Sequence, residues 1–100
     1  MSVLGELELA VMNVLWRSDS PLSVRAVHDS LRDVRGGAYT TVMTVLDRLA
    51  KKGIVERQLE GRAWRYQPAR SRVDLYVAAV QEILNELGAE DRRAVEAALR

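Results

Sequence analysis

The sequence contains no cysteine and no phenylalanine, and its only histidine is His28. The lack of cysteine excludes disulfide bonds and thiolate metal sites, and it fits a reducing compartment. No apolar run approaches the roughly 18 residues that a membrane-spanning helix needs. The N-terminus also lacks the basic region and cleavage site of a secretory signal. We therefore expect a cytoplasmic protein without membrane insertion.

The usual signatures of catalysis are missing as well. The sequence has no glycine-rich phosphate loop, no nucleophile elbow and no acid–base constellation. His28 has only Asp29 and Asp33 as neighbouring carboxylates, too few for a transition-metal site, so a surface or helix-packing role is expected for it. The sequence thus predicts a protein that is not an enzyme and that binds no metal and no cofactor.

The charges are distributed unevenly along the 100 residues. The net charge of +1 combines −2 for residues 1–34, +6 for residues 35–72 and −3 for residues 73–100. A local basic block is what binding to phosphates requires, although a solvated charged face has the same composition. Here the block coincides with a predicted helix and hairpin, which favours nucleic-acid binding.

Residues 39–53 predict one amphipathic helix. Its apolar stripe consists of Val42, Val45, Leu46 and Leu49. The opposite face offers Thr40, Thr44, Asp47 and Lys51, with Thr41 and Arg48 on its flanks. Threonine can bond base edges and arginine can bind guanine, so this face suits a DNA major groove. Asp47 stands out there: it either accepts from a cytosine amine or holds Arg48, Lys51 or another arginine in place.

Two short strands follow, Ile54 to Leu59 and Ala63 to Gln67, with Gly61 in the turn. A helix followed by such a hairpin is typical of a winged helix-turn-helix. Trp64 and Tyr66 are expected to pack on the inner face of the hairpin, and contact with a sugar–phosphate backbone is the alternative. Arg62 at the tip is placed to border a minor groove.

Two helices are predicted before this segment. The first spans about residues 5–17 and buries Leu4, Leu7, Val11, Met12, Val14 and Leu15. The second spans about residues 24–33, with Ser23 as its N-cap and Val24, Val27 and Leu31 inside. Gly36-Gly37 predicts a flexible loop before the third helix.

After Pro68 two more helices are predicted, over residues 73–87 with Ser71 as N-cap and over residues 90–99. Such short helices cannot form a core of their own, so they pack on the rest of the chain or on a second subunit. We favour the second subunit. The predicted dimerisation residues are Tyr76, Val77, Val80, Ile83, Leu84, Leu87, Val95 and Leu99.

Three runs carry a family resemblance. They are Glu6-Leu7-Glu8 with Val11-Met12 and Leu15-Trp16, Tyr39-Thr40-Thr41-Val42 through Arg48-Leu49-Ala50-Lys51-Lys52-Gly53, and Gly61-Arg62-Ala63-Trp64-Arg65-Tyr66-Gln67-Pro68. Together they resemble the penicillinase-repressor (BlaI/MecI/CopY) family of winged-helix transcriptional regulators over about residues 3–72. A generic winged helix would share the fold but not these runs.

The resemblance implies a mainly α (α+β) protein, with a winged helix-turn-helix DNA-binding domain over residues 1–70 and a C-terminal helical dimerisation region over residues 71–100. It implies a homodimeric repressor on double-stranded, dyad-symmetric operator DNA, with helix 39–52 in the major groove and wing 54–67 on the adjacent backbone. Thr41, Thr44 and Arg48 would face bases, and Thr40, Lys51, Lys52 and Arg62 would lie near phosphates. Tyr39 and Arg65 complete the predicted DNA-binding set.

The sequence also departs from the family pattern. Its C-terminal region is shorter than the resemblance leads us to expect. The best-known members are switched off when a membrane metalloprotease sensor signals for cleavage of that region, at an Asn-Phe bond in staphylococcal relatives. Here Asn85 is followed by Glu86, which argues against that sensor as a partner. The copper-sensing branch uses C-terminal cysteines, which this sequence lacks.

Two other functions stay open at this stage. One is a protein-interaction module whose basic face docks an acidic partner. The other is a repressor that responds to a small molecule, although the short C-terminal helices leave little room within one subunit for a pocket of about 300 Å³. Such a pocket could still form between subunits.

Overall fold

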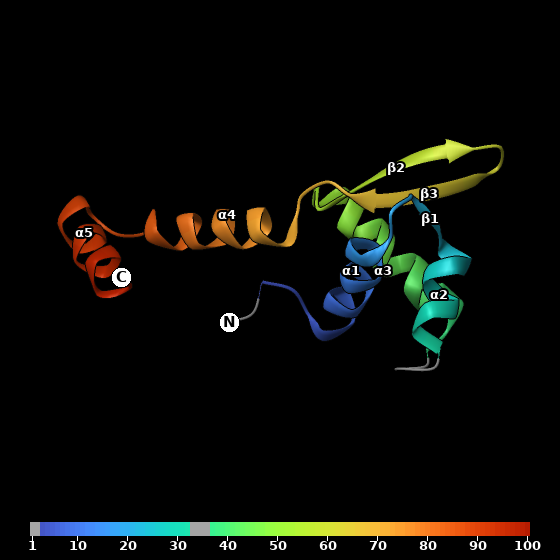
Figure 1. The fold of residues 1–100 in the computed structure, drawn as a ribbon, viewed down its shortest axis with the longest axis horizontal. Helices are drawn as coiled ribbons and strands as arrows, with labels where there is room; N and C mark the ends of the chain where they lie inside the picture. The colour runs from blue at the N-terminus through green and yellow to red at the C-terminus, as the bar shows by residue number, and fades with distance from the viewer. Residues whose placement is uncertain (1–2, 33–36) are drawn as a thin grey trace.

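The structure, a computed structural model, describes residues 3–32 and 37–100. The elements are α1 (Glu6–Arg17), β1 (Leu22–Ser23), α2 (Val24–Arg32), α3 (Tyr39–Lys51), β2 (Val55–Glu60), β3 (Ala63–Pro68), α4 (Arg72–Leu84) and α5 (Ala89–Ala98). Helices α1 to α3 pack beneath a small sheet, the β2–β3 hairpin projects at one end, and α4 and α5 lead away at the other (Figure 1). The molecule therefore measures 52 × 27 × 22 Å.

One hydrophobic core joins the first three helices to the sheet. The predicted apolar stripes of α2 and α3 are buried, and so is that of α1 except for Leu7, which is half-buried. The sheet contributes Val55 and Tyr66 to this core, and α4 contributes Leu75. The spacing of apolar residues in the sequence is thus sufficient to orient all three helices.

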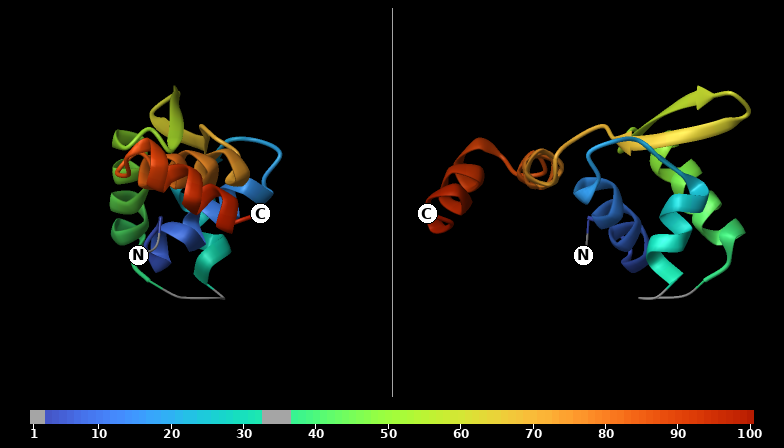
Figure 2. Two further views of the ribbon diagram at one scale, coloured as in Figure 1. Left: turned by 90° about the vertical axis from the view of Figure 1, so that its left-hand side faces the viewer. Right: turned by 45° about the vertical axis from the view of Figure 1, so that its right-hand side comes forward.

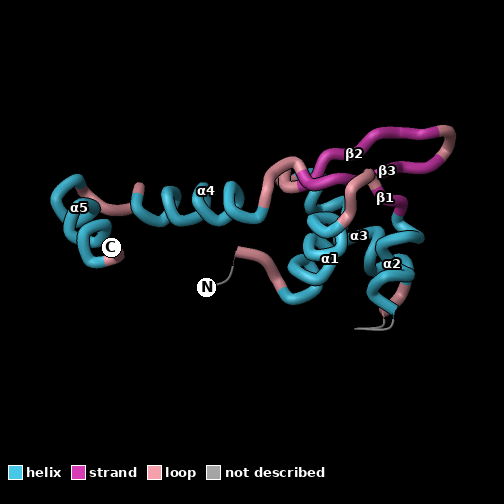
Figure 3. Tube along the Cα trace, viewed as in Figure 1, coloured by secondary structure: helices cyan, strands magenta, loops and turns pink. Residues whose placement is uncertain are grey.

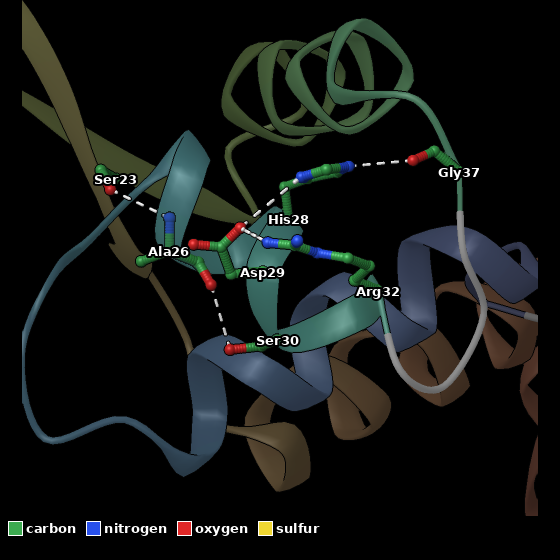
Figure 4. Close-up of polar contacts among 7 residues, drawn as sticks. All are labelled: Ser23, Ala26, His28, Asp29, Ser30, Arg32 and Gly37. Atoms are coloured by element: carbon green, nitrogen blue, oxygen red, sulfur yellow. Dashed lines mark hydrogen bonds and ion pairs between the residues drawn. The ribbon is translucent and has the colours of Figure 1, made fainter.

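Serine caps begin two of the helices as predicted. The hydroxyl of Ser23 accepts a hydrogen bond of 3.1 Å from the backbone N–H of Ala26 at the start of α2 (Figure 4). The hydroxyl of Ser71 accepts one of 3.1 Å from the backbone N–H of Asp74 at the start of α4. Each cap satisfies a backbone donor that the helix itself leaves unpaired. The predicted Gly36-Gly37 loop lies only partly within the described residues, where Gly37 has a φ of +119°.

The sheet has three antiparallel strands in the order β1-β3-β2, where the sequence predicted a two-stranded hairpin. Leu22 lies opposite Tyr66 and Ser23 opposite Arg65. Strand β1 was missed because two residues between a proline turn and a helix cap are too few to show alternation. This strand fixes the base of the hairpin, while Gly61, with a φ of +65°, turns its far end.

The last two helices stand away from the winged part of the chain (Figures 2 and 3). Helix α4 ends at Leu84 and not at the predicted Leu87, with Asn85 as its C-cap. The side chain of Arg92 in α5 donates a 2.7 Å hydrogen bond to the Asn85 side-chain oxygen across the bend. The predicted boundary at residue 70 lies directly before the Ser71 cap, and the division into two domains stays a prediction.

A polar joint attaches α4 to α1. The indole N–H of Trp16 donates to the backbone carbonyl of Arg70 at 2.9 Å. The guanidinium carbon of Arg72 lies 4.6 Å from the centroid of the Trp16 ring, and its Nη2 donates to the side-chain oxygen of Asn13 at 2.7 Å. The start of α4 is therefore held at defined points on the winged part. No helix in the described part of the chain is long and apolar enough to cross a membrane.

Candidate nucleic-acid interface

The face of α3 that points away from the core is exposed except at half-buried Asp47. Every predicted DNA-binding residue of this segment is exposed, namely Tyr39, Thr40, Thr41, Thr44, Arg48, Lys51 and Lys52. Thr40, Thr44 and Lys51 lie on the side of the helix opposite the buried stripe, with Thr41 and Arg48 on its flank. Tyr39 begins the helix beside His28, and Lys52 follows its last residue. The exposed face therefore offers hydroxyl, guanidinium and ammonium groups to a partner.

Thr44 is held by its own helix. Its hydroxyl donates a 2.9 Å hydrogen bond to the backbone carbonyl of Thr40, one turn earlier. This bond fixes the threonine side chain and leaves the hydroxyl oxygen available as an acceptor. Thr44 can therefore accept from a base amine or place its methyl group against thymine.

Asp47 makes two ion pairs, as one of the alternatives left open for it predicts. Its Oδ2 lies 3.0 Å from the ammonium of Lys51, and its Oδ1 lies 3.2 Å from Nη1 of Arg57 on β2. The hydrogen bond from Lys51 and the charges of Lys51 and Arg57 lower the pKa of Asp47. Asp47 therefore holds Lys51 and a wing arginine, and its carboxylate bridges the helix and the hairpin.

Lys52, directly after α3, forms an ion pair with Glu8 in the first turn of α1. Its ammonium lies 2.9 Å from Oε2 of Glu8, while Oε1 of Glu8 accepts a 3.0 Å hydrogen bond from the backbone N–H of Gly5. The Gly5 hydrogen bond, with help from Lys52, lowers the pKa of Glu8. Glu8 thus caps α1 and anchors the C-terminal end of α3 at the same time.

The hairpin carries the remaining predicted residues. Arg62 is exposed in the turn after Gly61, and Nε of half-buried Arg65 lies 3.5 Å from Oε2 of Glu60. The register places Trp64 and Tyr66 on one face, but only Tyr66 packs in the core, at 2% exposed. Trp64 is 40% exposed because it lies further along the hairpin, where hollows and not packed side chains lie between it and α3. The prediction of core packing is wrong for Trp64.

A hollow of about 430 Å³ brings two predicted residues together with one that was missed. It lies between the starts of α2 and α3 and the far part of the hairpin, and its lining includes Arg25, Tyr39 and Arg62. Arg25 belongs to the acidic first third of the sequence, so the charge balance gave no reason to select it. Its position two residues after the Ser23 cap, in the first turn of α2, was the available signal, since the start of this helix borders the third helix in a helix-turn-helix.

His28 supports the start of α3. Its Nε2 lies 2.9 Å from the carbonyl oxygen of Gly37 (Figure 4). Its ring meets the ring of Tyr39 edge-on, with the ring centroids 5.8 Å apart. His28 therefore has the packing role predicted for it. Within residues 3–32 and 37–100, no group of three or more potential ligands is placed to hold a metal ion.

The C-terminal helices expose an apolar surface. Of the eight predicted dimerisation residues, seven are exposed, namely Tyr76, Val77, Val80, Ile83, Leu87, Val95 and Leu99. Leu84 is only 7% exposed. Its side chain is already covered within one chain, so it is not available to a second subunit.

A three-helix core with a third helix exposed beside a β-hairpin defines a winged helix-turn-helix DNA-binding protein. The chain belongs to the penicillinase repressor family, whose sequence profile matches residues 4–99. It is therefore a transcriptional repressor of the BlaI type and not an enzyme, as the sequence predicted. The family assignment and the winged-helix fold class are likewise confirmed.

Individual relatives agree with this assignment. The chain is 47% identical over 96 residues to the transcriptional regulator BlaI of Mycobacterium tuberculosis, which covers 96% of this chain and 68% of the relative. The solution structure of the DNA-binding domain of the repressor BlaI matches with a TM-score of 0.63 and 32% identity, over 71% of this chain and 85% of that chain. The monomeric form of Bacillus licheniformis BlaI in complex with the blaP half-operator matches over the same shares, with a TM-score of 0.60 and 32% identity.

Proposed function

We propose that the protein is a cytoplasmic, homodimeric repressor that binds a dyad-symmetric operator. Each subunit places α3 in the major groove and its β2–β3 wing on the adjacent backbone. The observation that carries this proposal is the exposed face of α3, where threonine hydroxyls and Arg48 lie beside a basic hairpin. The relative that was solved with a half-operator supports it, because one copy occupies half of a site.

Base contacts come from the middle of α3 in this proposal. Thr41, Thr44 and Arg48 are exposed at successive turns of one helix face, so all three reach the floor of the same groove. The guanidinium of Arg48 can donate two hydrogen bonds to guanine, and the threonines can bond or touch neighbouring bases. These three residues carry the sequence preference.

Backbone contacts surround this centre. The residues assigned to phosphates are Thr40 and Lys51 on α3, Lys52 directly after it, Arg62 and Arg65 on the wing, and Tyr39 near the wing. We add Arg25, since it lines the same hollow as Tyr39 and Arg62. Contacts of this kind set the register and much of the affinity, and they make binding depend on salt.

The second subunit is assigned to the apolar surface of α4 and α5. Tyr76, Val77 and Val80 line one apolar hollow of about 440 Å³ on α4, and these side chains are exposed in a single chain. Burial of such a surface stabilises a dimer in proportion to the apolar area removed from water. A two-fold dimer binds an inverted repeat, with half-sites about 10 bp apart or a multiple of this distance.

Selection from a random duplex library tests the proposal, with the mass of the protein measured in parallel by sedimentation. We expect an enriched inverted repeat and a dimer. A library without any enriched motif would contradict the proposal. In that case, weak duplex binding that does not respond to salt would point to a protein-interaction module instead.

A further inference from the structure

The wing extends well beyond the part of it that is packed. On the face of the hairpin that continues from buried Tyr66, the next side chains are Trp64 and its cross-strand neighbour Leu59, 40% and 59% exposed. Between this part of the wing and α3 lies a hollow of about 330 Å³, lined by Met43, Thr44, Asp47, Arg57, Trp64 and Tyr66. Core packing therefore does not fix the outer wing against the helix.

Arg57 spans this hollow. It lies opposite Tyr66 in the sheet, and its guanidinium carbon is 4.6 Å from the centroid of the Trp64 ring. Its Nη1 donates to Oδ1 of Asp47 on α3 at 3.2 Å. Among the polar side-chain contacts of the described residues, this one alone joins the hairpin to α3. The arginine thus stacks on the wing and bonds to the helix at once.

Asp47 is suited to hold this arginine in a fixed position. Its second oxygen pairs with Lys51 one turn later, so both carboxylate oxygens have cationic partners and the carboxylate is restrained from two sides. Thr44, assigned above to bases, lines the same hollow one turn before Asp47. A shift of Arg57 would therefore move the wing relative to the base-contacting face.

We propose that Asp47 and Arg57 are positioning residues that set the distance between the wing and the recognition helix, so that backbone and base contacts form together. This inference rests on the proposed function. It explains why a carboxylate lies on a face that meets phosphates. Asp47 acts through Arg57, and Trp64 supplies the surface on which Arg57 is stacked.

The substitution Asp47→Asn separates this role from simple charge repulsion, because the two predict changes of opposite sign in the affinity for the operator. Loss of a negative charge near phosphates by itself tightens binding to every duplex. If Asp47 positions Arg57, Asp47→Asn weakens binding to the selected operator about tenfold, the size of one mismatched base pair. Binding to a scrambled duplex then stays equal or becomes tighter, so the ratio of the two affinities falls.

Two further variants sharpen the test. Glu56→Gln is the matched control, since Glu56 lies on β2 next to Arg57 and its carboxylate accepts a 3.3 Å hydrogen bond from Gln67 within the hairpin. It leaves the affinity ratio unchanged. In an Arg57→Ala background, Asp47→Asn causes no further loss of operator affinity, because the partner through which it acts is gone. Thermal unfolding checks that all variants remain folded.

Equal or tighter operator binding by Asp47→Asn would overturn the inference, and so would losses that add fully in the double variant. In both cases a wild-type protein that still selects one duplex leaves the proposed function intact. A wild-type protein that selects no duplex would overturn the proposed function and this inference with it.

Discussion

Arg48 lies one turn after Thr44 on the exposed face of α3, and the proposal assigns its long side chain to a base in the groove. Arg48→Ala is expected to cost about 1–3 kcal/mol of operator binding and to relax the preference at one base position. The measurement is the affinity for the selected operator and for each single-base variant of it. Arg93→Ala, the same change on exposed α5, serves as control. An unchanged operator affinity for Arg48→Ala would place α3 outside the groove.

Single residues show what a sequence pattern specifies and what it leaves open. Alternation placed Trp64 and Tyr66 on one face of the hairpin, and the register confirms this. It did not predict how far each side chain is buried, because burial depends on how closely the helices beneath the sheet approach it. The pairing of Asp47 with Arg57 was equally beyond the pattern, since it depends on how α3 and β2 lie in space.

The carboxylate of Glu8 joins the start of α1 to the end of α3. Because the Gly5 hydrogen bond and Lys52 lower the pKa of Glu8, its ionised form stabilises the fold. We expect Glu8→Gln to lower the free energy of unfolding by about 1 kcal/mol at neutral pH. The lowered pKa in the folded state means that this contribution is complete above the unfolded-state value of about 4.5 and disappears as pH falls through the folded-state value.

Urea unfolding of the wild type and Glu8→Gln from neutral to acid pH measures this difference. Glu90→Gln is the matched control, because Glu90 also lies in the first turn of a helix and has the same interaction with the helix dipole. A difference between wild type and Glu8→Gln that stays constant down to the lowest pH would show that the ionised carboxylate is not the source of the stability.

Helices were easier to predict than short strands and helix ends. The 3.6-residue period identified α1, α2 and α3 together with their buried faces, because nine or more residues give a clear repeat. Strand β1 has two residues and no repeat. We predicted that α4 ends at Leu87, but it ends at Leu84. Leu87 continues the apolar pattern although the helix has already ended.

At the scale of the whole molecule, the dimer is predicted to depend on the exposed face of α4. Val77 and Val80 are 48% and 46% exposed, so a charge at either position is tolerated by a single chain. Val77→Asp with Val80→Asp is expected to give a folded monomer, as measured by sedimentation and circular dichroism. Leu84 is unsuitable for this test because it is buried within the chain. A dimer that persists in the double variant would reject this surface.

The joint between α1 and α4 is expected to set the spacing of the half-sites. Arg72→Ala removes the guanidinium from Trp16 and from Asn13. The bond from Trp16 to the Arg70 carbonyl and the buried Leu75 still attach α4, but its direction relative to α3 is held less firmly. We expect unchanged affinity for one half-site but a broader tolerance of spacing, where each added base pair rotates a half-site by about 35°. The affinities for a series of spacings measure this effect.

Arg70→Ala is the control for this series, because Arg70 contributes its backbone carbonyl to the joint and the substitution keeps that carbonyl. It is expected to retain the spacing preference of the wild type. If Arg72→Ala also retains it, the joint does not govern spacing.

The most direct test of a dimer that recognises an inverted repeat compares two duplexes, the selected operator and the same duplex with one half-site scrambled. Because each wrong base pair costs about 1–3 kcal/mol and several are changed, we predict at least a 100-fold loss of affinity on scrambling, with two chains bound to the intact operator. Equal affinities for the two duplexes, with one chain bound to each, would contradict the proposal that two subunits recognise the operator together.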